Sequence, residues 1–258
     1  MHREEIKRSL HMACGHSTLL QRSLFTIMDW LTGQSWHVRR EIRKWLRNAP
    51  PHAHILDAGT GYGHQAYWLS KQNHRHSVLA IDESREHVCR GNAYVRDAQL
   101  NNLLFRTAAL EDFKADAAFD LILCTDAISH VADEASVLNN LHNSLRHEGL
   151  LIATAERRPA ETPKNQPANG YDMGELKQLF RDSGFHKVKA HYTGGWFGQA
   201  GRYLGVSIPL ALLRTSRLFA VIMPFYFLLV TPVVILFNWL DSHTAQTTGR
   251  GILLLARK

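Results

Sequence analysis

The sequence predicts an α/β fold with a doubly wound, mostly parallel sheet, and three observations carry this prediction. Apolar runs alternate with helix-compatible segments from residue 54 onward, which is the pattern of parallel strands joined by helices. A glycine-rich turn, Gly59 to Gly63, follows the first apolar run, and an acid, Asp82, ends the second. Because the carboxyl ends of parallel strands meet at one edge of a sheet, these features predict a ligand site at that edge.

The expected strands are short apolar runs bounded by turn residues. They cover residues 54–57, 77–82, 103–107, 119–125, 150–154, 186–192 and 251–256. Helices are expected over 38–46, from about 133 to 146, and over 172–182, where Asp172 is a suitable N-cap. The polar, proline-rich segment 157–170 predicts a loop.

The strand and helix pattern divides the chain into three parts. Residues 3–12 and 18–31 have the composition and spacing of helices, and they precede the prolines at 50 and 51. The expected parts are an N-terminal helical cap at 1–50, a main domain at 51–195 and 250–258, and an apolar insertion at 196–249.

Charge and cysteine content limit the partners and the compartment. Thirty lysines and arginines against 23 acids give a net charge of +7, which favours anionic surfaces such as phospholipid head groups or nucleic acid. The cysteines, Cys14, Cys89 and Cys124, form no Cys-x-x-Cys pair, and the sixteen histidines fit no ligand spacing. We therefore expect a reducing compartment and no metal. No export signal is evident, so the expected location is the cytoplasm.

The glycine turn has two interpretations. It could be an ordinary turn between a strand and a helix. Alternatively, Gly59, Gly61 and Gly63 let a ligand approach the backbone, and the helix that follows offers its unpaired N–H groups. Asp82 comes about 20 residues after the turn, and a carboxylate there can accept both hydroxyls of a ribose. The turn and the acid together predict a nucleoside-binding site.

Five sequence pieces in this order resemble the class I S-adenosylmethionine-dependent methyltransferases, particularly the ubiquinone and menaquinone (type 11) branch. The resemblance covers about residues 36–192 and the last strand. It is carried by ILDAGTGYG (55–63), LAIDES (79–84), ALEDF (109–113), FDLILCTDAISHV (119–131) and LRHEGLLIAT (145–154). The third glycine follows the second by two residues, as in these methyltransferases and unlike the dehydrogenases that share the fold outline.

The resemblance implies a Rossmann-like seven-stranded sheet with an antiparallel last strand, and S-adenosyl-L-methionine as cofactor. The glycines would make room for the methionyl part, which Asp57 would anchor, and Asp82 would hold the ribose. Glu83, Leu110 and Glu111 would border the adenine, while Cys124 and Thr125 would provide backbone contacts near the sulfonium. The implied cofactor-binding residues are Asp57, Gly59, Thr60, Gly61, Gly63, Asp82, Glu83, Leu110, Glu111, Cys124 and Thr125.

Candidate catalytic residues follow the fourth strand. Methyl transfer is an in-line displacement, so the protein must align the nucleophile and, where needed, remove its proton. Asp126 and His130 are four residues apart and would share one side of a helical turn. The family position written Glu-His-Val has Ser129 in place of the glutamate, so no metal is implied. His130 has two open interpretations, general base or structural histidine.

The apolar stretch 203–240 is the least ordinary part of the chain, and residues 218–240 contain no charge. In the family that the chain resembles, the last two strands pair, so a single membrane crossing between them would separate them. We therefore predict two or three short helices, broken at Pro209, Pro224 and Pro232, that lie in a membrane interface. A lid or a dimer interface is the alternative.

These features predict methyl transfer to a lipophilic acceptor, such as a phenol or quinone precursor, a polyene or another lipid. O-methylation is the first expectation, by a protein bound peripherally or monotopically to the inner face of the membrane. One alternative is a methyltransferase for a small soluble acceptor whose insertion forms a homodimer interface. Another is a non-catalytic cofactor-binding assembly protein. Nucleic acid is not expected as substrate, since the chain has no basic run interleaved with aromatic residues.

Overall fold

The structure, a computed structural model, describes residues 33–159, 170–215, 219–244 and 246–258. These residues form two compact units, one of residues 37–159, 170–195 and 246–258, the other of residues 33–36, 196–215 and 219–244. The helices predicted at 3–12 and 18–31 and most of the loop predicted at 157–170 lie outside the described residues.

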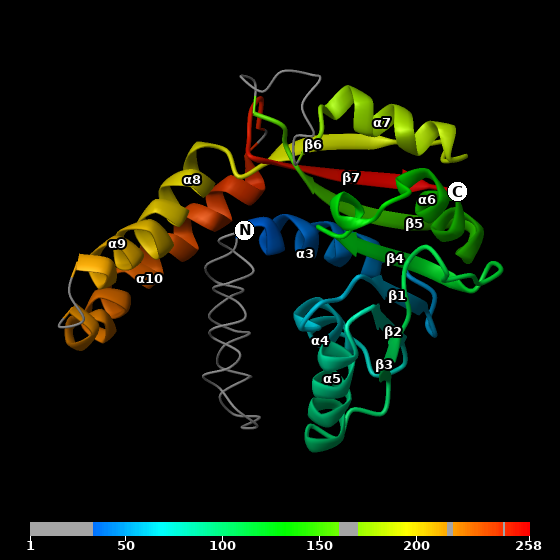
Figure 1. Ribbon diagram of the computed structural model, residues 1–258, viewed down its shortest axis with the longest axis horizontal. Helices are drawn as coiled ribbons and strands as arrows, with labels where there is room; N and C mark the ends of the chain where they lie inside the picture. Colours follow the sequence, from blue (N-terminus) through cyan, green and yellow to red (C-terminus); the bar gives the residue numbers. More distant parts are fainter. Residues whose placement is uncertain (1–32, 160–169, 216–218, 245) are drawn as a thin grey trace. The chain divides into compact units, whose positions relative to one another are not determined.

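The larger unit contains a seven-stranded sheet in the order β3-β2-β1-β4-β5-β7-β6 (Figure 1). Its strands are β1 (His54–Ala58), β2 (Ser77–Asp82), β3 (Leu103–Thr107), β4 (Phe119–Thr125), β5 (Leu145–Glu156), β6 (Lys189–Thr193) and β7 (Gly251–Arg257). The first five strands are parallel, and β7 is antiparallel to both of its neighbours. The predicted mixed sheet with an antiparallel last strand is confirmed.

Two strand boundaries differ from the prediction. β5 begins at Leu145 rather than at 150, so the last residues of the helix that was expected to reach 146 belong to this strand. The pairing of β4 with β5 shifts register between Phe119 and Leu121, and Glu148 has a positive φ of 61°. A local irregularity thus lies within the paired strand. β6 begins at Lys189 rather than at 186 because its pairing with β7 starts there.

In the part of the chain that the structure describes, five helices cover the sheet, and three of them begin with a side-chain cap. They are α3 (Gly33–Leu46), α4 (His64–Ser70), α5 (Arg85–Asp97), α6 (Glu134–Ser144) and α7 (Met173–Asp182). Asp172 caps α7 in a capping box with Glu175, which confirms the expected N-cap. Ser84 and Asp133 cap α5 and α6 by accepting hydrogen bonds from backbone N–H groups.

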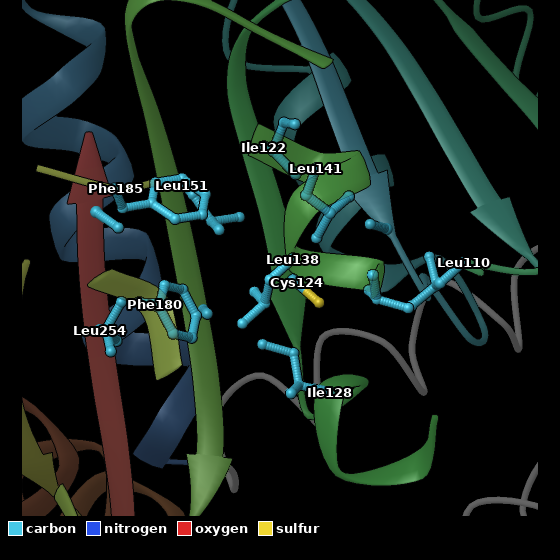
Figure 2. Close-up of a cluster of buried hydrophobic side chains, with 14 of the residues drawn as sticks. Leu110, Ile122, Cys124, Ile128, Leu138, Leu141, Leu151, Phe180, Phe185 and Leu254 are labelled. Atoms are coloured by element: carbon cyan, nitrogen blue, oxygen red, sulfur yellow. The ribbon is translucent and has the colours of Figure 1, made fainter. Parts of the chain in front are cut away.

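Alternate residues of the central strands face two hydrophobic layers. Ile55 and Leu121 belong to the layer that α3, α4 and α5 cover, whereas Leu56 and Ile122 belong to the layer that α6 and α7 cover. Figure 2 shows part of the second layer, in which the Cys124 sulfur lies among leucine, isoleucine and phenylalanine side chains. Both faces of the central strands are therefore buried, and the carboxyl-end edge of the sheet remains for a ligand.

The insertion forms a helical hairpin in the smaller unit. α8 (Trp196–Arg202), a π-helical turn η2 (Tyr203–Ser207) and α9 (Ile208–Thr215) follow one another, and α10 (Phe219–His243) packs against them (Figure 1). The two arms are antiparallel, since Gly198 lies against Asp241 and Gly201 against Asn238. The Gly198 N–H donates to Asp241 Oδ1 at 3.0 Å, so small residues and a buried polar pair join the arms.

The prediction that prolines divide the insertion into short helices is wrong. α10 runs for 25 residues and includes both Pro224 and Pro232. A proline removes one N–H donor and displaces the carbonyl four residues earlier, which weakens a helix without ending it where tertiary packing holds both sides. Pro209 is the second residue of α9, and the π-helical turn η2 ends two residues before it.

One side of α10 carries large apolar side chains that are exposed. We call this set the apolar face of α10: Ile222, Phe225, Leu228, Leu229, Val233, Leu236 and Trp239. Leu228 and Leu229 are 73% and 75% exposed. The segment Phe225–His243 is long and apolar enough to cross a membrane by length and composition, and 22% of its apolar window is buried. The opposite side, which includes Val234 and Asn238, is buried in the hairpin.

Candidate functional site

The glycine turn lies at the point where the strand order reverses, between β1 and its neighbours β2 and β4. Its backbone is fixed to β2, because the N–H groups of Gly59 and Thr60 both donate to the Ile81 carbonyl at 2.9 Å. Gly59, Gly61 and Gly63 all have positive φ, at 72°, 57° and 78°. Residues with a Cβ rarely adopt this conformation, so the sequence of three glycines matches what the turn requires.

The three glycines meet different surroundings. A Cβ on Gly59 would lie 2.5 Å from the Ala127 Cβ, just after β4, and a Cβ on Gly63 would overlap the Phe105 ring. A Cβ on Gly61 would meet no atom within 4 Å. Gly59 and Gly63 thus permit close packing of the turn, while Gly61 faces the open space that a ligand requires.

We expect Gly59→Ala to abolish measurable cofactor binding. The added methyl group combines a clash with Ala127 and a strained φ, at a cost of about 2–4 kcal/mol. Gly61→Ala is the matched control for folding stability, since it has the same positive φ but open space around it. Calorimetric titration of Gly59→Ala with S-adenosylhomocysteine and thermal melts of both variants test this. Equally lowered melting temperatures in the two variants would show that the close approach to Ala127 is unimportant.

Asp57 is the next-to-last residue of β1, just before the turn, and is 1% exposed. Its Oδ2 accepts a hydrogen bond from the Thr60 hydroxyl at 2.6 Å. Its Oδ1 accepts none from the residues that the structure describes. Burial raises the pKa of Asp57 to about 6, against hydrogen bonds from Thr60 and the Ala66 backbone that lower it. A buried carboxylate oxygen without a donor is a suitable partner for a cationic amino group.

The raised pKa of Asp57 predicts that cofactor affinity falls on acidification through pH 6. Above that pH the carboxylate is charged and attracts an ammonium group, whereas below it the acid is neutral and affinity falls by up to about tenfold per pH unit. Asp57→Asn should bind weakly at every pH. Burial makes the charged Asp57 carboxylate unfavourable in the folded state, and Asp57→Asn removes that charge. Above pH 6 and without ligand, this variant should therefore have a higher melting temperature than wild type. Binding titrations and thermal melts from pH 5 to 8 measure the two effects. If the affinity of Asp57→Asn still fell on acidification through pH 6 as it does in wild type, the prediction would be wrong.

Asp82 ends β2 next to the glycine turn. Its Oδ2 accepts from the Gly61 N–H at 2.8 Å, and its Oδ1 accepts from the Ser84 N–H and from His87 Nδ1, both at 3.0 Å. Burial acts to raise the pKa of the Asp82 carboxyl, but hydrogen bonds from His87, Ser84 and Gly61 outweigh it and lower the pKa. Asp82 is therefore a charged acceptor held against the turn. No sequence pattern indicates the His87 contact, which depends on the first turn of α5.

The remaining predicted cofactor residues surround the same edge of the sheet. Glu83 is exposed, and Leu110 is buried beside Gly59. The Glu111 carboxylate accepts from the Ala132 N–H at 3.3 Å, across the segment that follows β4. The Cys124 thiol is fully buried, and burial raises its pKa to about 12. Thr125 is half-buried at the end of β4, so Cys124 can face a ligand only through its backbone.

Asp126 and His130 do not share a helical turn, which corrects the geometry expected from their spacing. The 3-10 helix η1 covers only Ile128–His130, and Asp126 precedes it with a positive φ of 57°. The Thr154 hydroxyl donates to Asp126 Oδ1 at 3.1 Å, and the Asp126 N–H donates back to Thr154. Asp126 is thus fixed in an uncommon conformation at the end of β4, which is typical of functional sites. His130 is exposed.

A second polar pair lies at the same edge and was not predicted. The Tyr171 hydroxyl donates to the Glu134 carboxylate at the start of α6. The Tyr171 N–H donates to the carbonyl of Glu156, the last residue of β5, and the Tyr171 carbonyl accepts from the Arg158 N–H. Burial, together with the Glu134 charge, raises the pKa of the Tyr171 phenol above its usual value. The pair joins residues far apart in sequence, so no local pattern could reveal it. Among the residues that the structure describes, no group of three or more His, Cys, Asp or Glu could hold a metal.

This geometry fits a nucleoside that carries an amino acid group. An acceptor carboxylate, Asp82, suits a ribose, the space beside Gly61 admits the ligand, and the buried Asp57 oxygen suits an ammonium. A family model described as a methyltransferase domain matches residues 50–196, which is more than half of the chain.

Curated relatives carry methyltransferase names. The ubiquinone biosynthesis O-methyltransferase of Rickettsia prowazekii is 31% identical over 106 residues, which cover 40% of this chain and 40% of that protein. The sarcosine/dimethylglycine N-methyltransferase of Halorhodospira halochloris is 27% identical over 155 residues, which cover 55% of this chain and 54% of that protein. The chain thus matches about half or less of the length of these relatives.

Solved structures share the fold. A SAM-dependent methyltransferase from Aquifex aeolicus is 21% identical, with a TM-score of 0.50, and the match covers 58% of this chain and 82% of that chain. Phosphoethanolamine N-methyltransferase 2 of Haemonchus contortus, solved with S-adenosyl-L-methionine, is 13% identical, with a TM-score of 0.63, and the match covers 91% of this chain and 56% of that chain. From its sheet order, its glycine turn and the family match, the chain belongs to the class I S-adenosylmethionine-dependent methyltransferases, with S-adenosylmethionine as its cofactor.

Proposed function

We propose that the protein transfers a methyl group from S-adenosylmethionine to a lipophilic acceptor at a membrane surface. The observation that carries this proposal is the apolar face of α10, whose members are between 40% and 75% exposed. They recur at the three- and four-residue spacing of one helix side. A contiguous apolar surface of this kind marks a binding site for lipid or protein.

The chain topology favours a helix that lies along the membrane or dips into it. β6 precedes the hairpin, β7 follows it, and the two strands pair from Thr193 with Gly251 to Lys189 with Leu255. Both ends of the insertion therefore stay on one side of any membrane. One long side of α10 packs on α8 and η2 and only the other is apolar and exposed, which is the arrangement of a monotopic helix.

Charge and aromatic residues support a lipid surface as the partner of the insertion. Trp196, Tyr203 and Trp239 are exposed, and such side chains favour the interface between head groups and hydrocarbon. The net charge of +7 favours anionic lipid. In a cell these features would keep the protein at the cytoplasmic face of a membrane.

The acceptor that we propose is a phenol such as a quinone precursor, methylated on oxygen. The Rickettsia relatives named for ubiquinone biosynthesis support this choice. The cofactor supplies an electrophilic methyl group on a sulfonium; the phenolic oxygen forms the new C–O bond as the C–S bond breaks, and the electron pair stays on sulfur. The phenol loses its proton to a base, a role that we assign to Asp126 or His130 at the end of β4. The protein aligns the nucleophile behind the methyl group.

We expect labelled methyl groups to enter the organic phase of a membrane extract and not its aqueous phase. Full-length protein is incubated with S-adenosylmethionine labelled in the methyl group and with each fraction separately. Asp126→Asn and His130→Ala should slow transfer by about 100-fold if the residue is the base, and leave S-adenosylhomocysteine affinity unchanged. Label in aqueous metabolites alone would support a soluble acceptor, with the apolar face as a dimer interface. No transfer to any fraction, with cofactor binding intact, would support a non-catalytic assembly protein.

A further inference from the structure

His87 occupies part of the carboxylate to which we assign ribose binding. It lies in the first turn of α5, and its Nδ1 is 3.0 Å from Asp82 Oδ1. Because a charged carboxylate can only accept hydrogen bonds, Nδ1 carries the proton and donates it. The Tyr62 ring of the glycine turn lies 4.4 Å from the His87 ring, between centroids. His87 therefore contacts both the acid and a side chain of the glycine turn.

Asp82 does not need His87 for its orientation. The Ser84 N–H donates to Oδ1 at 3.0 Å, and the Gly61 N–H donates to Oδ2 at 2.8 Å. One backbone donor on each oxygen fixes both the position and the plane of the carboxylate. The contribution of His87 is thus to occupy a second acceptor site on Oδ1.

The number of acceptor sites is limiting. Each carboxylate oxygen offers about two lone-pair sites. On Oδ1 both are used, by the Ser84 N–H and His87 Nδ1, whereas Oδ2 has one site left beside the Gly61 N–H. A ribose presents two hydroxyl donors, one for each oxygen, so one donor must leave Oδ1. The Ser84 N–H belongs to the backbone at the start of α5, whereas the His87 side chain can rotate away.

We propose that His87 is an internal competitor of the cofactor ribose. Its imidazole leaves Asp82 when a nucleoside binds and returns when the nucleoside dissociates. His87 therefore lowers the affinity for the cofactor and for its demethylated product, and it speeds product release. This inference rests on the ribose-binding role proposed for Asp82, and it makes His87 a residue that acts through Asp82.

The test compares ligands with and without ribose hydroxyls. His87→Leu removes the competing donor and should bind adenosine and S-adenosylhomocysteine about fivefold more tightly than wild type. Binding of 2′,3′-dideoxyadenosine should be unchanged, because it has no hydroxyl to benefit. His87→Asn is the matched control, since its amide retains a donor near the position of Nδ1 and should preserve wild-type affinities. His87→Ala replaces the leucine variant if that variant does not fold.

Each outcome separates the inference from the site that supports it. If wild type binds adenosine and dideoxyadenosine equally, Asp82 does not hold the ribose, and the site assignment fails. If wild type prefers adenosine but His87→Leu binds it equally or more weakly, the site stands and the competition is refuted. A gain in affinity that is the same for the dideoxy ligand would also refute the inference, because it would not depend on the ribose.

Discussion

Asp82→Ala is expected to weaken S-adenosylhomocysteine binding by about 100-fold. The substitution removes two hydrogen bonds from ribose hydroxyls to a charged acceptor, each with a contribution of about 1.5 kcal/mol or more. It also leaves the Gly61 N–H without its carboxylate partner, so the glycine turn loses one of its attachments to β2. Calorimetric titration of the purified variant measures the effect.

Glu86→Ala is the matched control for this prediction. Glu86 lies four residues after Asp82, its side chain is 65% exposed, and its ion pair is with Arg90 on the same helix. An exposed pair of this kind contributes little to stability, and we expect wild-type affinity. Equal affinities of Asp82→Ala and wild type would refute the ribose site, and the proposed competition by His87 would fail with it.

Replacing two residues of the apolar face of α10 is expected to reduce binding to lipid vesicles by about 100-fold. Phe225 and Leu229 are 69% and 75% exposed and lie one helical turn apart. Transfer of each side chain from water to an apolar environment is favourable by about 1.5–3 kcal/mol. Phe225→Gln with Leu229→Gln removes this gain and retains good helix formers. Co-sedimentation with anionic and neutral phospholipid vesicles measures the partition.

Leu104→Gln is the control for the vesicle experiment. Leu104 is also a large apolar residue with 58% exposure, but it lies on β3 in the larger unit. Its replacement should leave vesicle binding unchanged. Full-length protein that stays monomeric without detergent and does not sediment with vesicles would exclude the membrane proposal. Protein that is dimeric in solution, and becomes monomeric in the double variant, would instead identify the apolar face as a contact between two copies.

The cofactor half of the site could be read largely from the sequence, because its requirements are local. A strand, a turn of three glycines with positive φ and an acid at the end of the next strand are each encoded by a few adjacent residues. The order of the strands then brings Gly61 and Asp82 together. No comparable short sequence pattern predicts the geometry of the acceptor half. The expected pairing of Asp126 with His130 failed because a left-handed residue at Asp126 interrupts the turn.

The insertion shows the same division between local and tertiary effects. Its apolar composition predicted a helical element between the last two strands, and that expectation is confirmed. The prolines, taken one by one, predicted helix ends, but packing of α10 on α8 and η2 holds the helix through both Pro224 and Pro232. A proline inside a helix lowers the stability of that helix by about 3 kcal/mol relative to alanine. The free energy of an extensive tertiary contact can exceed this cost.

By itself the sequence determined the fold class, the strands, the Asp172 cap and the glycine turn of the cofactor site, since each depends on residues close together in the chain. Only the tertiary structure decided that His87 shares the Asp82 carboxylate, that Tyr171 meets Glu134, and that α10 exposes one apolar face. The physical reason is that hydrogen bonds and burial depend on which distant segments meet. Adjacent residues specify the glycine turn, whereas its contacts with Asp82 and Ala127 depend on how the strands pack in the sheet.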